Sequence, residues 1–403
     1  MKRLLVFTAV CTVALTLLPS LLTAQVQKGR IVIPESSILR PEDLGLRAHT
    51  NIQLFYPKGV NPNSPTPTGE TPASLGCVYQ IVPSPQPGCP KTSTSNPTGG
   101  KGVIVIVDAF HYPNAAADLN VFASTFGLPA PKFKQMHAGN GVPPPDCGWE
   151  VEESLDVQWS FAMAPHAKIV LMEAQSNSDV DLMAAVDKAN VYIRNHGGRG
   201  EVSMSWQGGE FGGQIDLDTH FTEPGVVYFA SSGDTGGRVG WPSTSPNVVS
   251  AGGTRVNRSG GNFTNETGWS GSGGGPSTIE SRPSYQDVIQ DIVGNHRGTP
   301  DFSYDADPAS GVSVYNTSTQ SCGAFQWFVV GGTSVSSPAL AGIVNRANKF
   351  KHSTKAENTL IYNNLGNAIA FTDITSGHAG SYNAGPGWDF VTGVGTNLGK
   401  KGK

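Results

Sequence analysis

The stretch "VIVIVDAF", from Val103 to Phe110, indicates which class of fold this chain adopts. It is a continuous run of mostly β-branched residues, which is typical of a parallel strand that is buried on both faces. Further strands are expected in "KIVLMEA", "EVSMSW" and "GVVYFASSGD". Helical patterns lie between these strands, in "PNAAADLNVFASTFG", "EVEESLDVQWSFAMAPHA" and "SDVDLMAAVDKANVYIRNHG". The alternation predicts an α/β fold with a doubly wound, mostly parallel sheet flanked by helices.

The residues before this core differ from it in composition. Lys2 and Arg3 precede a long apolar run that ends near Ala24, so residues 1–24 are expected to be a signal peptide for export to the extracellular space or the periplasm. Residues 25–100 are expected to form a short, prosegment-like region, with a strand or two followed by a Pro-rich linker that includes "VNPNSPTPTGETPASLGC". No later stretch is long and apolar enough to span a bilayer, so no membrane contact is expected after signal removal.

The cysteines suggest two disulfides. Of the five cysteines, Cys11 would leave with the signal peptide, and the remaining four would meet an oxidising compartment. Cys77 and Cys89 bracket a Pro-rich loop and are the expected first pair, and Cys147 with Cys322 then follows by elimination. The chain has no Cys-x-x-Cys pair, so a zinc site built on cysteines is not suggested.

The charge balance excludes some classes of partner. Charged residues make up 14% of the chain, and the formal net charge is −4. The sequence has no basic patch, so nucleic acid is not an expected partner. A fold with few charges depends little on carboxylate ion pairs, which indicates tolerance of low pH.

The stretch "VVGGTSVSSPALAGIVNRANKF", from Val329 to Phe350, places hydroxyl groups at the start of an expected helix. Thr333 or Ser334 could simply cap that helix by accepting one of its free N–H groups. The alternative is that Ser334 is a nucleophile. The preceding glycines leave the approach open, and the helix N-terminus offers N–H donors to an oxyanion.

Three carboxylates are candidates for the chemistry around such a serine. Glu152 and Asp156 are four residues apart in a helical pattern, which places them on one face, where they would share a proton. The alternative for this pair is a solvated acidic face that also includes Glu150 and Glu153. Asp234 follows a buried strand in "FASSGDTGG". It is either an Asx-turn residue or an acid that donates a hydrogen bond to an oxyanion.

Together these stretches resemble a known family. "GGTSVSSP", "ESLDVQW" and "SSGDTGG" look like the signatures of the sedolisin (serine-carboxyl) peptidases, and "SMSW", "GWSGSGGGPS", "RGTPDFSYDADPASG" and "AGPGWDFVTGVG" support the resemblance in the family's order. The resemblance implies a subtilisin-like fold and a peptidase domain over residues 101–403. It also implies that Ser334 is the nucleophile, Glu152 the general base, Asp156 the acid that orients Glu152, and Asp234 a donor to the oxyanion.

The resemblance also implies one structural calcium ion near the C-terminus. The matching carboxylates belong to Asp373 and Asp389, and the matching backbone carbonyls to Ile374, Gly385 and Gly387. Calcium prefers several oxygen ligands, and glycines let carbonyl groups turn inward, so these residue types suit the ion.

Two further residues are predicted to lie near the site. Asp108 ends the first core strand and is interpreted as an acid near Glu152 and Asp156, the alternative being a strand-end turn residue. Trp206 follows a strand and could line the substrate cleft or belong to the core.

Three functions fit these sequence patterns. The favoured one is a secreted, acid-active serine-carboxyl peptidase that cleaves protein or peptide substrates as a monomer, with endopeptidase action favoured over tripeptidyl-peptidase action. A glutamate base still accepts protons in mild acid, where an imidazole is already protonated. A subtilisin-like Asp-His-Ser peptidase is the first alternative, but His137 and His196 lie in settings typical of loops or helix ends. The other alternative is a non-catalytic exported binding protein on the same scaffold.

Overall fold

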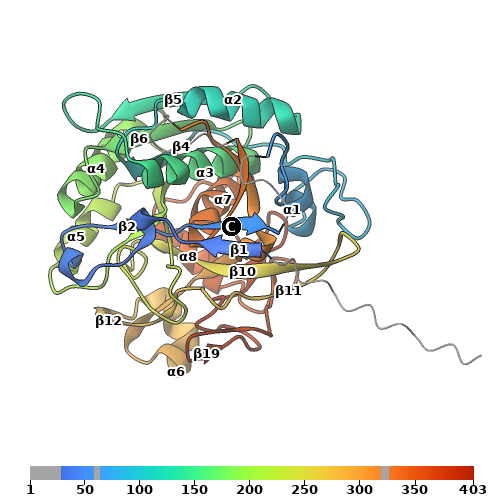
Figure 1. Cartoon of the computed structure of the whole chain (residues 1–403). Helices are drawn as coiled ribbons and strands as arrows, with labels where there is room; N and C mark the ends of the chain where they lie inside the picture. The colour runs from blue at the N-terminus through green and yellow to red at the C-terminus, as the bar shows by residue number, and fades with distance from the viewer. Residues whose placement is uncertain (1–28, 59–63, 319–325) are drawn as a thin grey trace, which may run out of the picture.

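The computed structural model describes residues 29–58, 64–318 and 326–403 (Figure 1). Its centre is a ten-stranded sheet with the strand order β17-β20-β14-β10-β9-β7-β4-β6-β5, in which β11 also pairs with β10. The pairings from β5 across to β20 are parallel, and only those of β11 with β10 and β17 with β20 are antiparallel. The predicted α/β class with a mostly parallel sheet is confirmed. The strands are β4 (Val103–Ala109), β5 (Lys132–His137), β6 (Lys168–Ala174), β7 (Gly200–Met204), β9 (Val226–Ser231), β10 (Val249–Ser259), β11 (Asn262–Gly268), β14 (Phe302–Asp305), β17 (Phe371–Thr372) and β20 (Thr396–Asn397).

Helices cover both faces of this sheet, and β4 shows why. Its side chains alternate between two buried clusters. Ile104 and Ile106 pack in the cluster that contains helices α2, α3 and α7, whereas Val105 packs in the cluster that contains helix α4. A strand covered on both faces has no solvent-facing side, which explains its uninterrupted apolar sequence. The main helices are α2 (Ala115–Phe126), α3 (Cys147–Met163), α4 (Asp179–Asn195), α7 (Thr333–Ala347) and α8 (Thr354–Tyr362).

The N-terminal region is built into the same molecule through two pairings. Strand β3 (Gln53–Pro57) lies between β1 (Gly29–Val32) and β16 (Trp327–Gly331) in a four-stranded sheet that ends with β15 (Val312–Tyr315). Strand β2 (His49–Thr50) pairs antiparallel with β8 (Trp206–Gln207) (Figure 1). Because β16 leads directly into α7, these pairings bring residues 49–57 to the N-terminus of that helix.

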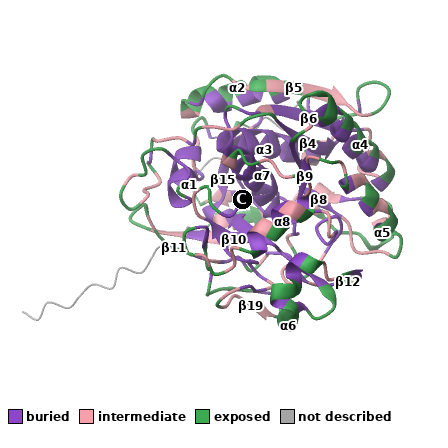
Figure 2. Ribbon diagram, turned by 180° about the vertical axis from the view of Figure 1, so that it is seen from behind, coloured by how far each residue is buried: buried purple, intermediate pink, exposed green. Residues whose placement is uncertain are grey.

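Part of the stretch predicted to be a Pro-rich linker is a helix, so that prediction was wrong there. Helix α1 (Pro72–Val78) is buried along its whole length, and Figure 2 shows it as a buried element. Thr71 and Ser74 form a reciprocal capping box, with Pro72 at the first helical position. Proline suits that position, because its missing N–H would have no partner there. The prolines and hydroxyl residues start a helix in this stretch.

The glycine-rich stretch "SGGNFTNETGWSGSGGGPS" has the composition of an irregular surface loop, but the structure shows strands in it. It contains strand β11 and the start of β12 (Gly275–Ser281), which pairs with β13 (His296–Thr299). Gly260 and Gly261, with φ angles of +57° and +86°, form the two-residue turn between β10 and β11. A Gly-Gly pair between strands is a hairpin signal, because both turn positions need positive φ.

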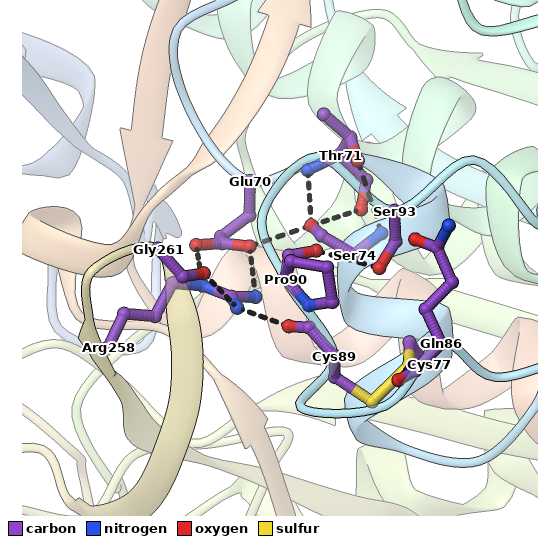
Figure 3. The surroundings of a disulfide bond; sticks show 10 residues. All are labelled: Glu70, Thr71, Ser74, Cys77, Gln86, Cys89, Pro90, Ser93, Arg258 and Gly261. Carbon is purple, nitrogen blue, oxygen red and sulfur yellow. Dashed lines mark hydrogen bonds and ion pairs between the residues drawn. A yellow bond between two sulfur atoms is a disulfide. The ribbon is translucent and has the colours of Figure 1, made fainter.

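The predicted disulfide between Cys77 and Cys89 is confirmed (Figure 3). Beside it, Arg258 donates hydrogen bonds from Nε and one terminal nitrogen to both oxygens of Glu70, at 2.7 Å each. The second predicted pairing cannot be described, because Cys322 lies outside the described residues, as does the predicted signal peptide.

None of the helices of the described residues combines the length and the apolar character needed to cross a bilayer.

Shorter elements complete the described chain. The shorter elements are the helices α5 (Gln214–Leu217) and α6 (Gln290–Val293), the strands β18 (His378–Ala379) and β19 (Tyr382–Asn383), and 3₁₀ turns at Glu35–Ser37, Pro41–Asp43, Asp218–Phe221, Ser284–Ile289 and Pro308–Ser310.

Candidate active site

The backbone between β16 and α7 approaches Asn51 and Asp234 closely just before Ser334. Gly332 has a φ of +107°, a conformation that side-chain-bearing residues rarely adopt. A Cβ atom at Gly332 would lie 2.1 Å from the backbone oxygen of Asn51 and 2.5 Å from Oδ2 of Asp234. Glycine is therefore required here both by the backbone angle and by the space that it leaves beside Ser334.

Ser334 is hydrogen-bonded to a glutamate from a different helix. Its Oγ lies 3.0 Å from Oε2 of Glu152 and 3.0 Å from the backbone oxygen of Ser205, and both oxygens can accept from the hydroxyl. Ser334 and Glu152 are 182 residues apart in the chain and both are 0% exposed. The packing of α3 against α7 brings them together. No histidine of the described residues hydrogen-bonds to Ser334.

The surroundings of Glu152 favour its protonated form. Burial raises the pKa of Glu152, the negative charges of Asp156 and Asp108 raise it further, and the hydrogen bond from Ser334 lowers it. Burial followed by the charge of Asp108 also raises the pKa of Asp156, and neither of its carboxylate oxygens has a hydrogen-bond partner among the described residues. Close buried carboxyl groups share protons, so Glu152 and Asp156 titrate as a unit.

Asp234 lies beside Gly332 and Thr333, at the N-terminus of α7. Its Oδ1 accepts hydrogen bonds from the backbone N–H of Thr333 at 2.7 Å and from the Thr333 hydroxyl at 2.9 Å. Its Oδ2 is buried without a hydrogen-bond partner. Burial raises the pKa of Asp234 to about 7, and the hydrogen bonds from Thr333 oppose this. Below that pH a protonated Asp234 could donate a hydrogen bond from Oδ2.

Part of the chain's own N-terminal region lies against Ser334. The backbone N–H of Ser334 donates to the backbone oxygen of Asn51 at 3.1 Å, and the backbone N–H of Asn51 donates to Oγ of Ser334 at 3.2 Å. The preceding residues, His49 and Thr50, form β2 and pair with Gln207 and Trp206 of β8. Residues 49–51 therefore lie against Ser334 as an extended strand whose carbonyl group points at the helix N-terminus.

Asp108 and Trp206 are both buried next to this region. Asp108 ends β4 with no hydrogen-bond partner for either carboxylate oxygen, and burial followed by the charge of Glu173 raises its pKa. Trp206 is 0% exposed, and its indole N–H donates to the backbone oxygen of Val107 at 2.8 Å. Its side chain belongs to the core, whereas its backbone holds β2 in the cleft.

The residues expected to bind calcium converge on one loop. Oδ2 of Asp373 accepts from the backbone N–H of Gly387 at 2.9 Å, and Oδ2 of Asp389 accepts from that of Gly385 at 3.0 Å. In the described residues, neither aspartate forms an ion pair with a lysine or an arginine. Two uncompensated carboxylates beside a glycine loop and Ile374 form an oxygen-only donor set, which fits calcium.

Sequence reasoning missed two residues at this site. Asn51 lies far before the motif-bearing part of the chain, and no local pattern marks it. Ser205 lies within the quoted motif "SMSW", but the contributing atom is its backbone oxygen, which every residue type has. A backbone contribution leaves no signal in side-chain chemistry.

The fold is that of subtilisin-like proteins. A solved structure of Pseudomonas sedolisin, a serine-carboxyl proteinase complexed with pseudo-iodotyrostatin, matches 82% of this chain and 96% of its own with a TM-score of 0.66 and 27% identity. Sphericase matches 83% of this chain and 99% of its own with a TM-score of 0.56 and 17% identity, which shows the shared fold alone.

Sequence comparison leads to the same family. Kumamolisin from Bacillus sp. (strain MN-32) is 29% identical over 376 residues, which cover 83% of this chain and 63% of kumamolisin. Sedolisin from Pseudomonas sp. (strain 101) is 28% identical over 347 residues, which cover 75% of this chain and 57% of that sedolisin. No protein-family model matches the chain. These comparisons support the sedolisin family, which the motifs suggested, and the chain spans about three fifths of the length of these relatives.

The buried carboxyl groups predict that the protein is less stable at pH 8 than at pH 5. Burial raises the pKa of Asp234 and of Glu357 to about 7. The native state therefore binds more protons than the unfolded state, in which such groups titrate at about 4. Stability then falls as the pH rises from about 4 to about 7. Thermal unfolding should show a Tm several degrees lower at pH 8.

This measurement is best made in a Ser334→Ala background, to prevent self-digestion. Glu357→Gln should reduce the difference in Tm between the two pH values, because glutamine cannot ionise. A Tm that is equal or higher at pH 8 would contradict the prediction.

Proposed function

We propose that this protein is an acid-active serine-carboxyl peptidase that cleaves peptide bonds in protein or peptide substrates. The observation that carries the proposal is the 3.0 Å hydrogen bond between Oγ of Ser334 and Oε2 of Glu152 at the N-terminus of α7. The similarity to sedolisin-family peptidases supports it. Export is part of the proposal and rests on residues 1–24 alone. N-terminal sequencing of protein from the culture medium would test it.

The proposed reaction passes through an acyl-enzyme on Ser334. Oγ attacks the substrate carbonyl carbon while its proton moves to Glu152, and the carbonyl oxygen becomes an oxyanion that the backbone N–H of Ser334 and the protonated Asp234 stabilise. Glu152 then gives its proton to the departing amine. A water molecule repeats the sequence on the acyl group, passing its proton to Glu152, and this releases the acid and restores Ser334.

The protonation states that Glu152 and Asp234 need for catalysis decide the pH range of activity. Glu152 must be ionised to accept the serine proton, and the hydrogen bond from Ser334 favours that form, whereas burial and the charges of Asp156 and Asp108 oppose it. Asp234 must be protonated to donate, and it loses its proton as the pH passes about 7. Activity is therefore expected on the acidic side of neutrality.

Removing either side chain of the hydrogen bond between Ser334 and Glu152 should abolish activity. Ser334→Ala removes the nucleophile and Glu152→Gln removes the base, so each should lower kcat on a denatured protein substrate at pH 4–5 by at least about a thousandfold. Ser336→Ala is the matched control. Ser336 is a buried serine of the same helix, with only a long 3.5 Å contact to the backbone oxygen of Tyr304. Peptidase activity that survives in purified Ser334→Ala protein would refute the proposal.

Asp234→Asn tests the oxyanion donor separately. An asparagine can keep the contacts to Thr333 through Oδ1 and donate from Nδ2 at any pH, so the fall in kcat near neutral pH should move to higher pH. Asp234→Ala removes the donor and should lower kcat by about a hundredfold or more at every pH. An unchanged pH profile in Asp234→Asn would show that Asp234 does not set the neutral limit.

The self-contact of Asn51 supports endopeptidase action. The backbone carbonyl of Asn51 lies against Ser334, and the chain continues N-terminally past His49, the residue two positions before it. Ala48 exchanges hydrogen bonds with Asn177, through its N–H at 2.9 Å and its backbone oxygen at 2.7 Å. Contacts that hold such an extended chain against Ser334 do not require a free N-terminus three residues before the bond. The same contacts imply that residues 47–52 exclude substrate until they leave or are cut.

The bond between Asn51 and Ile52 is accordingly the expected site of self-cleavage. Incubation of the purified protein at pH 4–5 should produce a new N-terminus at Ile52, visible by mass spectrometry, together with a rise in peptidase activity. Ser334→Ala should remain uncut. A rate independent of protein concentration would show that the cut is intramolecular, and a first cut at another bond would contradict the assignment of Asn51.

We also propose that Asp373, Ile374, Gly385, Gly387 and Asp389 hold one structural calcium ion. Removal of calcium with a chelator should lower Tm, because the carboxylates of Asp373 and Asp389 would lose the positive charge that balances them. Asp389→Ala should make Tm insensitive to calcium. A chelator that leaves the Tm of the unaltered protein unchanged would argue against the site.

A further inference from the structure

A group of metal-ligating side chains lies at the edge of the sheet, outside the proposed catalytic residues and the proposed calcium loop. His111 follows β4, His137 ends β5, and Glu173 lies near the end of β6. Nδ1 of His111 and Nε2 of His137 lie 3.0 Å and 3.1 Å from the same carboxylate oxygen, Oε2 of Glu173. The three ligand atoms all lie within 4.8 Å of one another.

The carboxylate of Glu173 is held in place by contacts to its other oxygen. Oε1 accepts hydrogen bonds from Nε2 of Gln135 at 2.6 Å and from the backbone N–H of Tyr112 at 3.0 Å. These contacts direct Oε2 toward the two imidazole rings. Hydrogen bonds to the non-coordinating atoms of a ligand are a regular feature of metal sites, because they fix the ligand's orientation.

The burial pattern gives an ion both a reason to bind and a route of entry. The side chain of Glu173 is 0% exposed, whereas those of His111 and His137 are 20% and 25% exposed. Asp108 pairs in register with Glu173, and the buried Glu153 is close enough for its charge to interact with that of Glu173. Among the described residues, no lysine or arginine forms an ion pair with these three acids. A buried cluster of acids that has no lysine or arginine partner favours a cation.

We propose that His111, His137 and Glu173 bind one divalent transition-metal ion of the zinc class. Two imidazole nitrogens and one carboxylate oxygen are a donor set that zinc prefers, and water would take the fourth position. In a tetrahedral zinc site the ligand atoms lie about 3.3 Å apart, close to the separations seen here. The ion would join the ends of β5 and β6 to the segment after β4, next to Asp108.

The simpler alternative is that each histidine forms only an ion pair with Glu173. His220 provides a matched control for this, because its Nδ1 lies 2.8 Å from Oδ1 of Asp187 without a second histidine in the group. An ion pair of that kind needs no metal. The two alternatives therefore differ in whether zinc binding depends on His111 and His137 but not on His220.

The test is a zinc titration of the full chain at pH 7.5 by calorimetry. The protein should be purified without a polyhistidine tag, carry Ser334→Ala to prevent self-digestion, and be saturated with calcium to block the loop at Asp373 and Asp389. We expect one zinc ion per chain and a higher Tm when zinc is bound. His111→Ala and His137→Ala should each weaken binding at least tenfold, and His220→Ala should not.

Cobalt substitution gives a second readout that does not depend on stability. Cobalt bound through two imidazoles and a carboxylate should give visible absorption bands that Glu173→Gln alters or abolishes. If His137→Ala fails to fold, His137→Gln replaces it, since that side chain is partly exposed. Failure to bind zinc, or equal affinity in the His111, His137 and His220 variants, would overturn the proposal and leave the peptidase assignment untouched.

Discussion

The hydrogen bond between Ser334 and Glu152 is the interaction on which the rest of this site depends. It joins the N-terminus of α7 to the middle of α3, so it exists only because these helices pack against each other on one face of the sheet. Burial of both residues excludes water and raises the pKa of the carboxyl group. The same burial therefore sets both the geometry of the pair and the pH above which Glu152 can accept a proton.

Space in front of Ser334 is the second constraint. Gly332 places no side chain between Asp234 and Asn51, so the backbone carbonyl of Asn51 can reach the N–H of Ser334 at the helix N-terminus. A backbone carbonyl is the group that a peptide substrate would present there. The N-terminal region reaches this position because β2 and β3 pair with strands on either side of the site. Sheet pairing thus links the fold of residues 29–57 to the accessibility of Ser334.

Local patterns predicted much of this fold and part of the site. The β-branched run of β4 and the helical patterns of α3 and α4 identified the core elements. A strand that is buried on both faces has an uninterrupted apolar sequence, and a helix that packs on a sheet has apolar residues at helical spacing. The four-residue spacing of Glu152 and Asp156 placed them on one helix face. Two interpretations were wrong. Composition suggested loops at α1 and at the β10–β11 hairpin, where a capping box and the Gly260–Gly261 turn are the deciding signals.

The sequence by itself determined the α/β class, the order of the core elements and the residue types available for chemistry. Only the tertiary structure decided which distant residues meet: Ser334 with Glu152, Asn51 with the helix N-terminus, and His111 and His137 with Glu173. The physical reason is that residue order encodes local periodicity and turns. Contacts between distant segments depend instead on strand order and helix packing, which minimise the free energy of the whole chain.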